Sequence, residues 1–389
     1  MPVEVVFFNV GQGDCTLLWF YDRANKDVGT HAVLIDCGST RPVVPHGSTL
    51  GAPPGADART KVVARLRNRL DWYLSRLRNP YVIDYLILTH PDEDHFNLLK
   101  EVLLVDRGEG PGVLPGLRYS IGQIIHSMHI KDYKERGDDF LWTMFHHWQQ
   151  FEGASGQRVL NAPAQASMPS PPLTLVDKPL GAGLHLVGGV FGAFTDDVRK
   201  YEQGPKEPIA NLNSLVTVVT GEPDAFGKRQ KVLLMGDAVD LNEREIMNLS
   251  LPIARRESQL WLKLGHHGSV TSTTDAWLDY TTPDGLFVST GDKLFGGRTA
   301  TCTKANIADR LLPHWRTVRR RHSIPDPRVR AGQQWGYVLE NNKQFTHTPT
   351  TEGLFSSMAL PQGTAGWQGV DWHLKLDDTA PGSYEIWYE

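Results

Sequence analysis

The sequence predicts an α/β fold in which residues with catalytic or metal-binding chemistry follow the ends of short buried strands. The chain has 389 residues, which is enough to bury a large core. Five short apolar runs have the length of buried strands, and each ends in a group of Gly, Asp or His residues. Residues 61–79 carry apolar side chains at helical spacing. Strand and helix patterns in one chain indicate the mixed α/β class.

Each strand-like run leads into one polar group. In chain order, residues 5–10 lead into Gly11-Gln12-Gly13-Asp14, 33–35 into Asp36-Cys37-Gly38, 82–88 into Thr89–His95, 232–235 into Gly236-Asp237, and 262–265 into His266-His267-Gly268-Ser269. A sheet holds its backbone rigidly while the loops at its strand ends vary, so metal and active-site residues gather there. We therefore expect these groups to build the functional site.

The densest of these groups is Thr89-His90-Pro91-Asp92-Glu93-Asp94-His95. His90, Asp92 and Asp94 are two residues apart and can converge from a tight loop, and His95 adds a further nitrogen. Imidazole and carboxylate groups bind divalent metals at about 2.0–2.2 Å. The alternative is an acidic surface turn with incidental histidines, but so many potential ligands in so short a segment favour a metal site.

Six motifs occur in a fixed order between Val5 and about Ser269: NVGQGD, LIDCG, LTHPDEDH, NLNSLV, LLMGD and LGHHGS. In these motifs the chain resembles the metallo-β-lactamase superfamily, and in particular the branch that contains the soluble domain of the DNA-internalisation competence protein ComEC. The resemblance implies a four-layer αββα sandwich that holds metal ions at one edge and catalyses hydrolysis.

The resemblance also implies roles for individual residues. The expected ligands of two divalent ions, Zn²⁺ or Mn²⁺, are His90, Asp92, Asp94, His95, Asp237 and His266. Asp237 would bridge the ions, and Asp94 would also orient the attacking water. Asp36 would not bind an ion itself but would orient the residues that do. His267 would donate a proton or contact a phosphoryl oxygen, although which of His266 and His267 is the ligand stays open. Ser214 and Ser269 are candidate substrate contacts, with structural hydroxyl roles as the alternative.

The chain departs from the superfamily pattern at two positions. Asp92 stands where most members have histidine, a change that the ComEC-like branch shares. The histidine expected between residue 95 and the bridging aspartate is not identifiable; His126 and His129 are candidates, or ordinary histidines at a strand end. The first metal position would then suit a harder ion such as Mn²⁺, which accepts more oxygen ligands.

These ligands predict metal-assisted hydrolysis. A metal lowers the pKa of its bound water from about 15.7 to about 7, and two metals can hold both the attacking oxygen and an oxygen of the substrate. We expect a dinuclear hydrolase, and the resemblance, together with basic segments of the chain, implies a phosphodiesterase or nuclease. The alternatives are a hydrolase of a small phosphoester or ester, and a metal-binding regulatory module with weak or absent catalysis.

Composition limits the class of protein. Hydrophobic residues make up 40% and charged residues 22% of the chain, and the net charge is −4, as in ordinary globular proteins. No apolar run approaches the roughly 20 residues of a membrane span, and the N-terminus has no signal-peptide pattern. The three cysteines are an odd, low number that fits a reducing compartment. We expect a cytoplasmic protein without membrane contact.

The chain divides into a predicted catalytic domain, 1–330, and a β-rich C-terminal extension, 331–389, which could pack on the main domain or meet a protein partner. A long irregular insertion at about 151–210 could be a lid or substrate-selecting loop, or a surface insertion without a role at the site. Two basic segments, one face of the helix at 61–79 and the run Arg316–His322, would suit a phosphodiester or nucleic-acid substrate. Solvated surface or oligomer contacts are the alternative for both.

Overall fold

The computed structural model describes residues 1–40, 42, 55–105, 116–127, 132–133, 139–146, 152–154, 159–161, 173–176, 183–186, 209–248, 258–289, 304–325, 327, 335–338, 344–347, 354–356, 358–359, 368–381 and 383–389. Most of the predicted insertion at about 151–210 lies outside these residues, and so does His129.

The first β-sheet is built from the N-terminal part of the chain and completed by the C-terminus. Across this sheet the strands are β21 (Tyr384–Tyr388), β20 (Trp372–Leu376), β1 (Val3–Phe7), β2 (Thr16–Asp22), β3 (Asn25–Ile35), β4 (Val82–Leu88), β6 (Gly116–His126) and β5 (Leu104–Val105), with β7 (Glu152–Ala154) and β8 (Val159–Asn161) paired to β6. β3, β4 and β6 are parallel neighbours. Their carboxyl ends therefore lie on one edge of the sheet.

The second β-sheet, like the first, contains parallel neighbouring strands. Its strands are, in order across the sheet, β17 (Leu354–Ser356), β14 (Gly285–Val288), β13 (Ser258–Lys263), β12 (Arg229–Leu234), β11 (Thr217–Pro223), β10 (Gly183–Leu186) and β9 (Leu173–Val176). β12, β13 and β14 are parallel. Two short pairs lie outside both sheets: β15 (Trp335–Val338) with β16 (Gln344–His347), and β18 (Met358–Ala359) with β19 (Gln368–Gly369).

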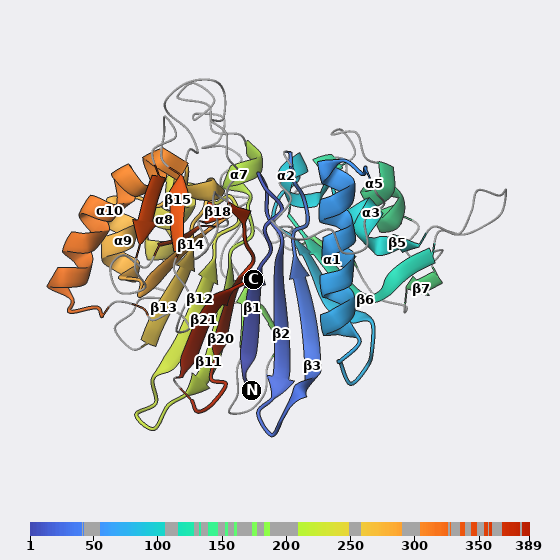
Figure 1. The fold of residues 1–389 in the computed structure, drawn as a ribbon, viewed down its shortest axis with the longest axis horizontal. Coiled ribbons are helices and arrows are strands. Elements are labelled where there is room, and N and C mark those ends of the chain that lie inside the picture. The colour runs from blue at the N-terminus through green and yellow to red at the C-terminus, as the bar shows by residue number, and fades with distance from the viewer. Residues whose placement is uncertain are drawn as a thin grey trace.

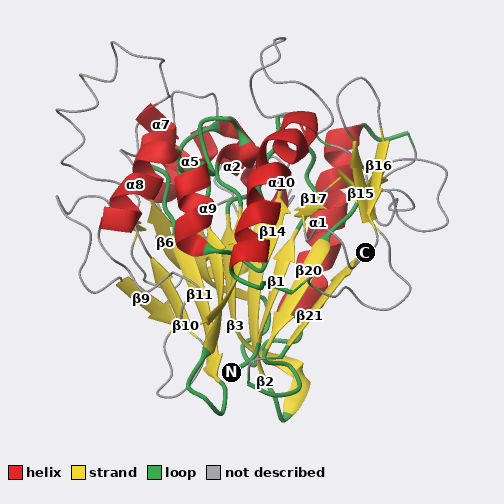
Figure 2. Ribbon diagram, turned by 90° about the vertical axis from the view of Figure 1, so that its left-hand side faces the viewer, coloured by secondary structure: helices red, strands yellow, loops and turns green. Residues whose placement is uncertain are grey.

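Helices flank the pair of sheets on both sides (Figures 1 and 2). On the side of the first sheet lie α1 (Ala58–Leu74), α2 (Glu93–Phe96), α3 (Leu99–Leu103) and α5 (Asp139–His146). On the side of the second lie α7 (Ile209–Leu212), α8 (Asp240–Asn248), α9 (Asp275–Thr281) and α10 (Lys304–Arg321). α1 ends before the predicted boundary at residue 79, because Arg76 and Arg78 exchange backbone hydrogen bonds with Gly29 instead of continuing the helix.

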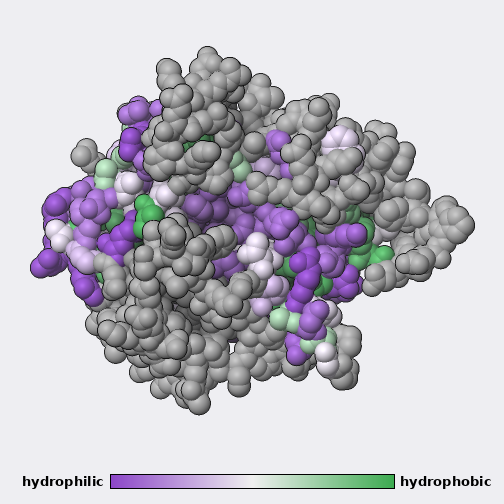
Figure 3. Space-filling view, turned by 90° about the horizontal axis from the view of Figure 1, so that it is seen from above, coloured by the Kyte–Doolittle hydropathy of each residue, from purple (hydrophilic) through white to green (hydrophobic). Residues whose placement is uncertain are grey.

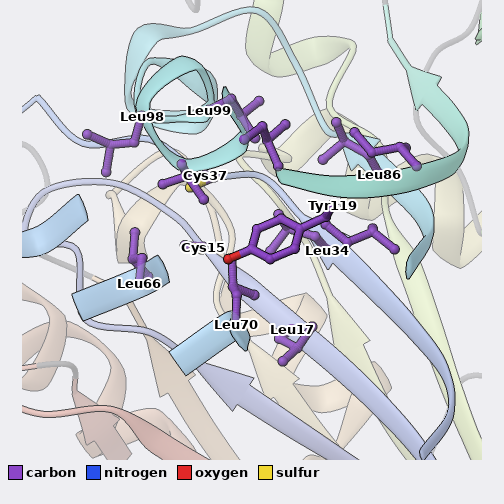
Figure 4. Close-up of a cluster of buried hydrophobic side chains, with 14 of the residues drawn as sticks. Cys15, Leu17, Leu34, Cys37, Leu66, Leu70, Leu86, Leu98, Leu99 and Tyr119 are labelled. Atoms are coloured by element: carbon purple, nitrogen blue, oxygen red, sulfur yellow. The ribbon is translucent and has the colours of Figure 1, made fainter. Parts of the chain in front are cut away.

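Three buried apolar clusters separate the layers. One cluster, with Val5, Phe7 and Trp261, fills the space between the two sheets. Another packs α1 and α3 on the first sheet (Figure 4), and the third packs α9 and α10 on the second. The order helix, sheet, sheet, helix is the four-layer αββα sandwich that the sequence predicts.

The C-terminal segment that the sequence predicts as an extension supplies strands to both large sheets. β20 pairs with β1 along its whole length, and β17 pairs with β14. Asp371, just before β20, is fully buried: its carboxylate accepts from the backbone of Asn9 and pairs with Arg65 of α1. The described part of this segment is therefore integral to the sandwich.

None of the described helices is both long and apolar enough to cross a membrane.

Candidate metal centre

Loops that follow strands of both sheets bring buried His and Asp side chains together at one edge of the sandwich. Nitrogen and oxygen atoms of His90, His95 and Asp237 lie within 4.8 Å of one another, and so do those of Asp94, His95 and His267. All of these side chains are buried. Figure 3 is a view from above this edge and shows hydrophilic residues gathered across its middle.

Asp237 lies at the centre of the cluster, and its two carboxylate oxygens face different histidines. Oδ2 is 3.6 Å from Nε2 of His90, whereas Oδ1 is 3.2 Å from Nε2 of His95 and 3.6 Å from Nε2 of His267. Gly236, which precedes it, has φ of 55°, and a side chain there would collide with the hydroxyl of Ser214. The turn after β12 therefore requires glycine to present Asp237 in this way.

His95 is held between two carboxylates. Its Nδ1 lies 2.8 Å from Oδ2 of Asp36, which turns Nε2 toward Asp237. Asp36 is itself fixed by Thr89, whose backbone N–H and hydroxyl donate to it at 2.8 and 2.6 Å. This is how proteins orient a metal-binding imidazole from behind, and it is the place that the sequence predicts for Asp36.

The remaining residues of the Thr89–His95 segment lie on two sides of Asp237. Nε2 of His90 is 3.7 Å from Oδ2 of Asp92, whose side chain is 18% exposed. Oδ2 of Asp94 is 3.4 Å from Nε2 of His267. The segment thus offers His90 and Asp92 on one side, and Asp94 and His95 on the other.

His266 and His267 have clearly different environments. His267 is buried, with Nδ1 2.9 Å from the carbonyl of Ser289 and Nε2 in the cluster. His266 is 22% exposed, and its Nε2 is 4.0 Å from Oδ2 of Asp237. These distances place His267 within the cluster and His266 at its open side, and so favour His267 in the choice that the sequence leaves open.

The turn that carries both histidines is strained and firmly held. His266, His267 and Gly268 have φ of 43°, 50° and 76°, a region that non-glycine residues adopt only when the surroundings enforce it. Arg310 of α10 helps to hold the turn in this backbone conformation. Its guanidinium donates to the carbonyls of Gly268, Ser269 and Thr273 at 3.2, 2.9 and 2.9 Å.

Charges within the cluster shift its pKa values in opposite directions. Burial alone raises the pKa of Asp237, but the rings of His267 and His95 pull it well below its ordinary value. Burial lowers the pKa of His267, yet the carboxylates of Asp237 and Asp94 raise it to about 9. For His266 burial prevails over Asp237, and the pKa falls below its ordinary value. The carboxylates of Asp237 and Asp94 therefore favour the protonated, positively charged form of the buried His267.

Both predicted substrate serines lie in supporting positions. Ser214 is fully buried, and its hydroxyl accepts from the backbone N–H of Asp237 at 2.8 Å. Ser269 is also fully buried, and its hydroxyl accepts from that of Thr271 at 3.1 Å. Neither side chain is exposed to a substrate in this arrangement, which favours the alternative, structural roles.

His126 lies apart from the ligand groups. It is buried, its ring stacks on Phe145 at 4.9 Å, and Nδ1 is 3.1 Å from the carbonyl of Ser127. It belongs to none of the close His and Asp groups among the described residues. This arrangement favours an ordinary histidine at the end of β6.

Two residues of the centre were not singled out by the sequence. Asp14 lies within 4.8 Å of the Asp237 and His267 ligand atoms and pairs with Lys263. Asn211, on α7, is fully buried, with its amide nitrogen 3.2 Å from Nε2 of His266. Both belong to motifs that carry the resemblance, NVGQGD and NLNSLV, and that membership was the available signal.

The two basic segments are largely occupied by contacts within the chain. On α1, Arg65 pairs with Asp371 and Arg69 with Glu389. On α10, Arg319 is buried beside the ring of Trp315, and Arg321 pairs with Asp279 at 2.8 Å. These contacts favour structural roles over a continuous phosphate-binding surface.

The described residues fit divalent metal ions. Nε2 of His90, His95 and His267 and Oδ1 of Asp237 are buried and make no hydrogen bond of good geometry, which is costly unless something else binds them. The carboxylates of the cluster are those of Asp14, Asp36, Asp92, Asp94 and Asp237, and the one buried ammonium among them is that of Lys263. Their formal charges sum to minus four, the charge that two divalent ions would balance.

No family model matches the chain, and no curated protein matches it. Among solved structures that match, unliganded yeast PDE1 is 11% identical with a TM-score of 0.37, over 83% of this chain and 96% of that one. A diphosphatase from the PhnP family is 12% identical with a TM-score of 0.31, over 76% of this chain and 89% of that one.

Proposed function

We propose that the chain is a hydrolase that uses two divalent metal ions, and that its substrate is a phosphodiester. The observation that carries this proposal is the position of Asp237, whose two oxygens face different groups of ligands. A carboxylate in this position can bridge two ions. Paired ions are typical of phosphatases, nucleases and other enzymes that stabilise an attacking and a leaving oxygen together.

The distances support a division of these residues between two ions. The first ion would be held by His90, Asp92 and Oδ2 of Asp237, and the second by Asp94, His95, His267 and Oδ1 of Asp237. Three protein ligands leave the first ion open to substrate or solvent, as in catalytic sites. Its ligands include two carboxylates, which suits Mn²⁺ as well as Zn²⁺.

When bound, the ions would supply a hydroxide nucleophile at neutral pH and withdraw charge from the phosphoryl group. The chain supplies the positioning. Asp36 fixes the ring of His95, and Ser289 fixes that of His267. His266 stands on the exposed side, where it can contact a phosphoryl oxygen or the leaving group.

The orientation of His266 is set by two neighbours. Nδ1 lies 2.9 Å from the hydroxyl of Thr271, and Nε2 lies 3.2 Å from the amide nitrogen of Asn211. Both contacts are satisfied when Nδ1 carries the proton and Nε2 accepts from Asn211. A hydroxyl group or water arriving beside Asp237 would then meet the amide of Asn211 as a donor and Nε2 of His266 as an acceptor.

We also propose a reducing compartment, the cytoplasm, for this activity. Cys15 and Cys37 are buried free thiols in one apolar cluster (Figure 4). An oxidising compartment would favour their conversion to a disulfide or to other oxidised forms.

The experiment is a metal-dependent activity screen on the full chain. Metal is removed with a chelator, and Mn²⁺, Zn²⁺ or Mg²⁺ is added back with bis(p-nitrophenyl) phosphate, p-nitrophenyl phosphate, single- or double-stranded DNA, or RNA. We expect turnover of the diester that requires metal and falls at least about 100-fold in Asp237→Asn, because amide replacement removes the bridging charge. Asp22→Asn, which changes a half-exposed carboxylate at the far end of β2, is the matched control.

Two outcomes would contradict the proposal. Metal-independent turnover would exclude the mechanism, and metal-dependent turnover of the monoester alone would replace the substrate class with small phosphoesters. Comparison of the polymers then separates a nuclease from an enzyme that acts on small diesters.

A further inference from the structure

Asp14 and Lys263 form a buried ion pair beside the metal centre. The ammonium of Lys263 contacts Oδ2 of Asp14, and the two side chains are only 4% and 3% exposed. Lys263 ends β13 of the second sheet, and Asp14 lies in the loop after β1 of the first. The pair therefore joins the two sheets immediately behind the ligands.

The backbone of Asp14 is fixed by the two loops that carry other residues of the centre. Its N–H donates to the carbonyl of Asp94 at 2.9 Å, and its carbonyl accepts from Gly38 at 3.0 Å. Gly13 packs so closely that an added Cβ would lie 2.1 Å from the carbonyl oxygen of Gly38. The carboxylate of Asp14 thus has little freedom to turn away.

The carboxylate of Asp14 lies close to the other residues of the centre, and its second oxygen has no hydrogen-bond partner in the part of the chain that the structure describes. Asp14 shares one close group of ligand atoms with Asp36 and His95, and another with Asp237 and His267, each within 4.8 Å. Oδ1 is buried and has no hydrogen-bond partner among the described residues. A buried carboxylate oxygen without a partner is costly, so a cation on this side would satisfy it.

We propose that Asp14 is a further ligand of the second ion, with Lys263 holding its other oxygen. This inference rests on the proposed function, because it requires that ion to bind. Asp14 would add a third carboxylate to Asp94 and Asp237 around the two imidazoles. A site with more than four ligands and mostly oxygen suits Mn²⁺ or Mg²⁺, whereas Zn²⁺ commonly takes four. Asp14 would therefore raise the affinity of this site for Mn²⁺ or Mg²⁺ relative to its affinity for Zn²⁺.

A purely structural ion pair makes a different prediction. Removing one partner of a buried pair leaves an uncompensated charge, whereas replacing both partners with uncharged groups of similar volume is often neutral. The double variant Asp14→Asn with Lys263→Met removes the ligand and the ammonium together. If the pair were only structural, that variant would bind metal as the wild type does.

The experiment is calorimetric titration of Mn²⁺ and Zn²⁺ into the metal-free full chain, with bound ions counted by elemental analysis. The proteins are wild type, Asp14→Asn, Lys263→Met and the double variant, and circular dichroism checks that each is folded. We expect two ions in the wild type and a Mn²⁺ affinity of the second ion about ten-fold or more lower in the double variant, with a smaller loss for Zn²⁺. Wild-type Mn²⁺ affinity in the double variant would overturn the proposal, whereas a wild type that binds no ion would contradict the proposed function itself.

A second readout covers the case in which the double variant does not fold. Co²⁺ absorbs visible light more strongly as its ligand number falls. Loading Co²⁺ into Asp14→Asn should therefore strengthen the absorption relative to the wild type, and an unchanged spectrum would overturn the role of Asp14 as a ligand.

Discussion

Two adjacent histidines on the turn after β13 have different surroundings, and we expect different roles for them. His267 is buried and lies within 3.6 Å of both Asp94 and Asp237. His266 is partly exposed and is held by Thr271 and Asn211. Three successive residues with positive φ turn the two rings in different directions.

Alanine substitutions separate the two histidines. We expect His267→Ala to bind one ion fewer, because a ligand of the second ion is lost. His266→Ala should keep both ions and lose about 10²–10⁴-fold in kcat, the usual contribution of a side chain that takes part in proton transfer. Elemental analysis and steady-state kinetics measure both effects. If His266→Ala instead lost an ion, His266 would be a ligand of the first ion.

Some residues of the centre could be predicted from the sequence, and others could not. His90, Asp94, His95 and Asp237 stand out because each directly follows a strand-like run. Asp14 also follows such a run, but its pairing with Lys263 could not be predicted, because the two residues lie 249 positions apart. The order of His266 and His267 depends on backbone angles that side-chain spacing does not reveal.

At the level of elements, the histidine turn depends on α10. Arg310 binds three carbonyls of the turn and of the residues after it. The sequence indicated a basic run at Arg316–His322 but did not single out Arg310. Contact between α10 and that turn is a long-range feature that periodicity alone cannot supply.

Removing this arginine should loosen the turn. We expect Arg310→Ala to lower metal affinity or kcat about 10–100-fold, the usual cost of losing support behind ligands. Arg320→Ala is the matched control, since Arg320 is exposed on the same helix and bonds only locally to Thr317. Equal effects of both variants would assign the loss to the positive charge of α10 rather than to the hydrogen bonds between Arg310 and the turn.

Helix α8 contributes a buried acid that holds the residues after the turn. Glu243 accepts from the backbone of Thr273 and from the backbone and hydroxyl of Thr274. Burial outweighs these hydrogen bonds and raises the pKa of Glu243 from 4.5 to about 7. Between these values the folded chain retains a proton that the unfolded chain has released.

That difference in proton binding predicts a pH dependence of stability. The contribution of Glu243 is fully present below pH 4.5 and is lost as the pH rises through about 7. The loss amounts to roughly 3 kcal/mol at 1.36 kcal/mol per pKa unit. Urea unfolding of wild type and Glu243→Gln across this range should show a steeper fall for the wild type. If the free energy of unfolding fell equally with pH in both proteins, the raised pKa of Glu243 would be contradicted.

For the whole molecule, the termini of the chain meet in one sheet. β20 and β21 extend the first sheet beyond β1, and Arg65 with Asp371 joins this hairpin to α1. The α/β class and the alternation of strands and polar loops follow from local patterns, whereas the αββα layers are implied by the resemblance of the six motifs. The pairing of β1 with β20 follows from neither, because it joins residues more than 360 positions apart.

The buried pair between α1 and the C-terminal hairpin should be essential to stability. Asp371→Ala leaves Arg65 buried without its carboxylate, and we expect the free energy of unfolding to fall by about 3–5 kcal/mol. Chemical denaturation followed by circular dichroism measures the change. A loss below about 1 kcal/mol, the value for an exposed pair, would mean that the hairpin is held by its strand pairing and apolar contacts alone.

The most direct test of the dinuclear centre is electron paramagnetic resonance of the full chain loaded with Mn²⁺. We expect two ions per chain and the signal of an exchange-coupled pair, because Asp237 would hold both ions if the proposed centre forms. In Asp237→Asn the coupled signal should disappear, while Asp22→Asn keeps it. A wild type that shows only isolated Mn²⁺, or one ion per chain, would contradict the bridged centre and the mechanism built on it.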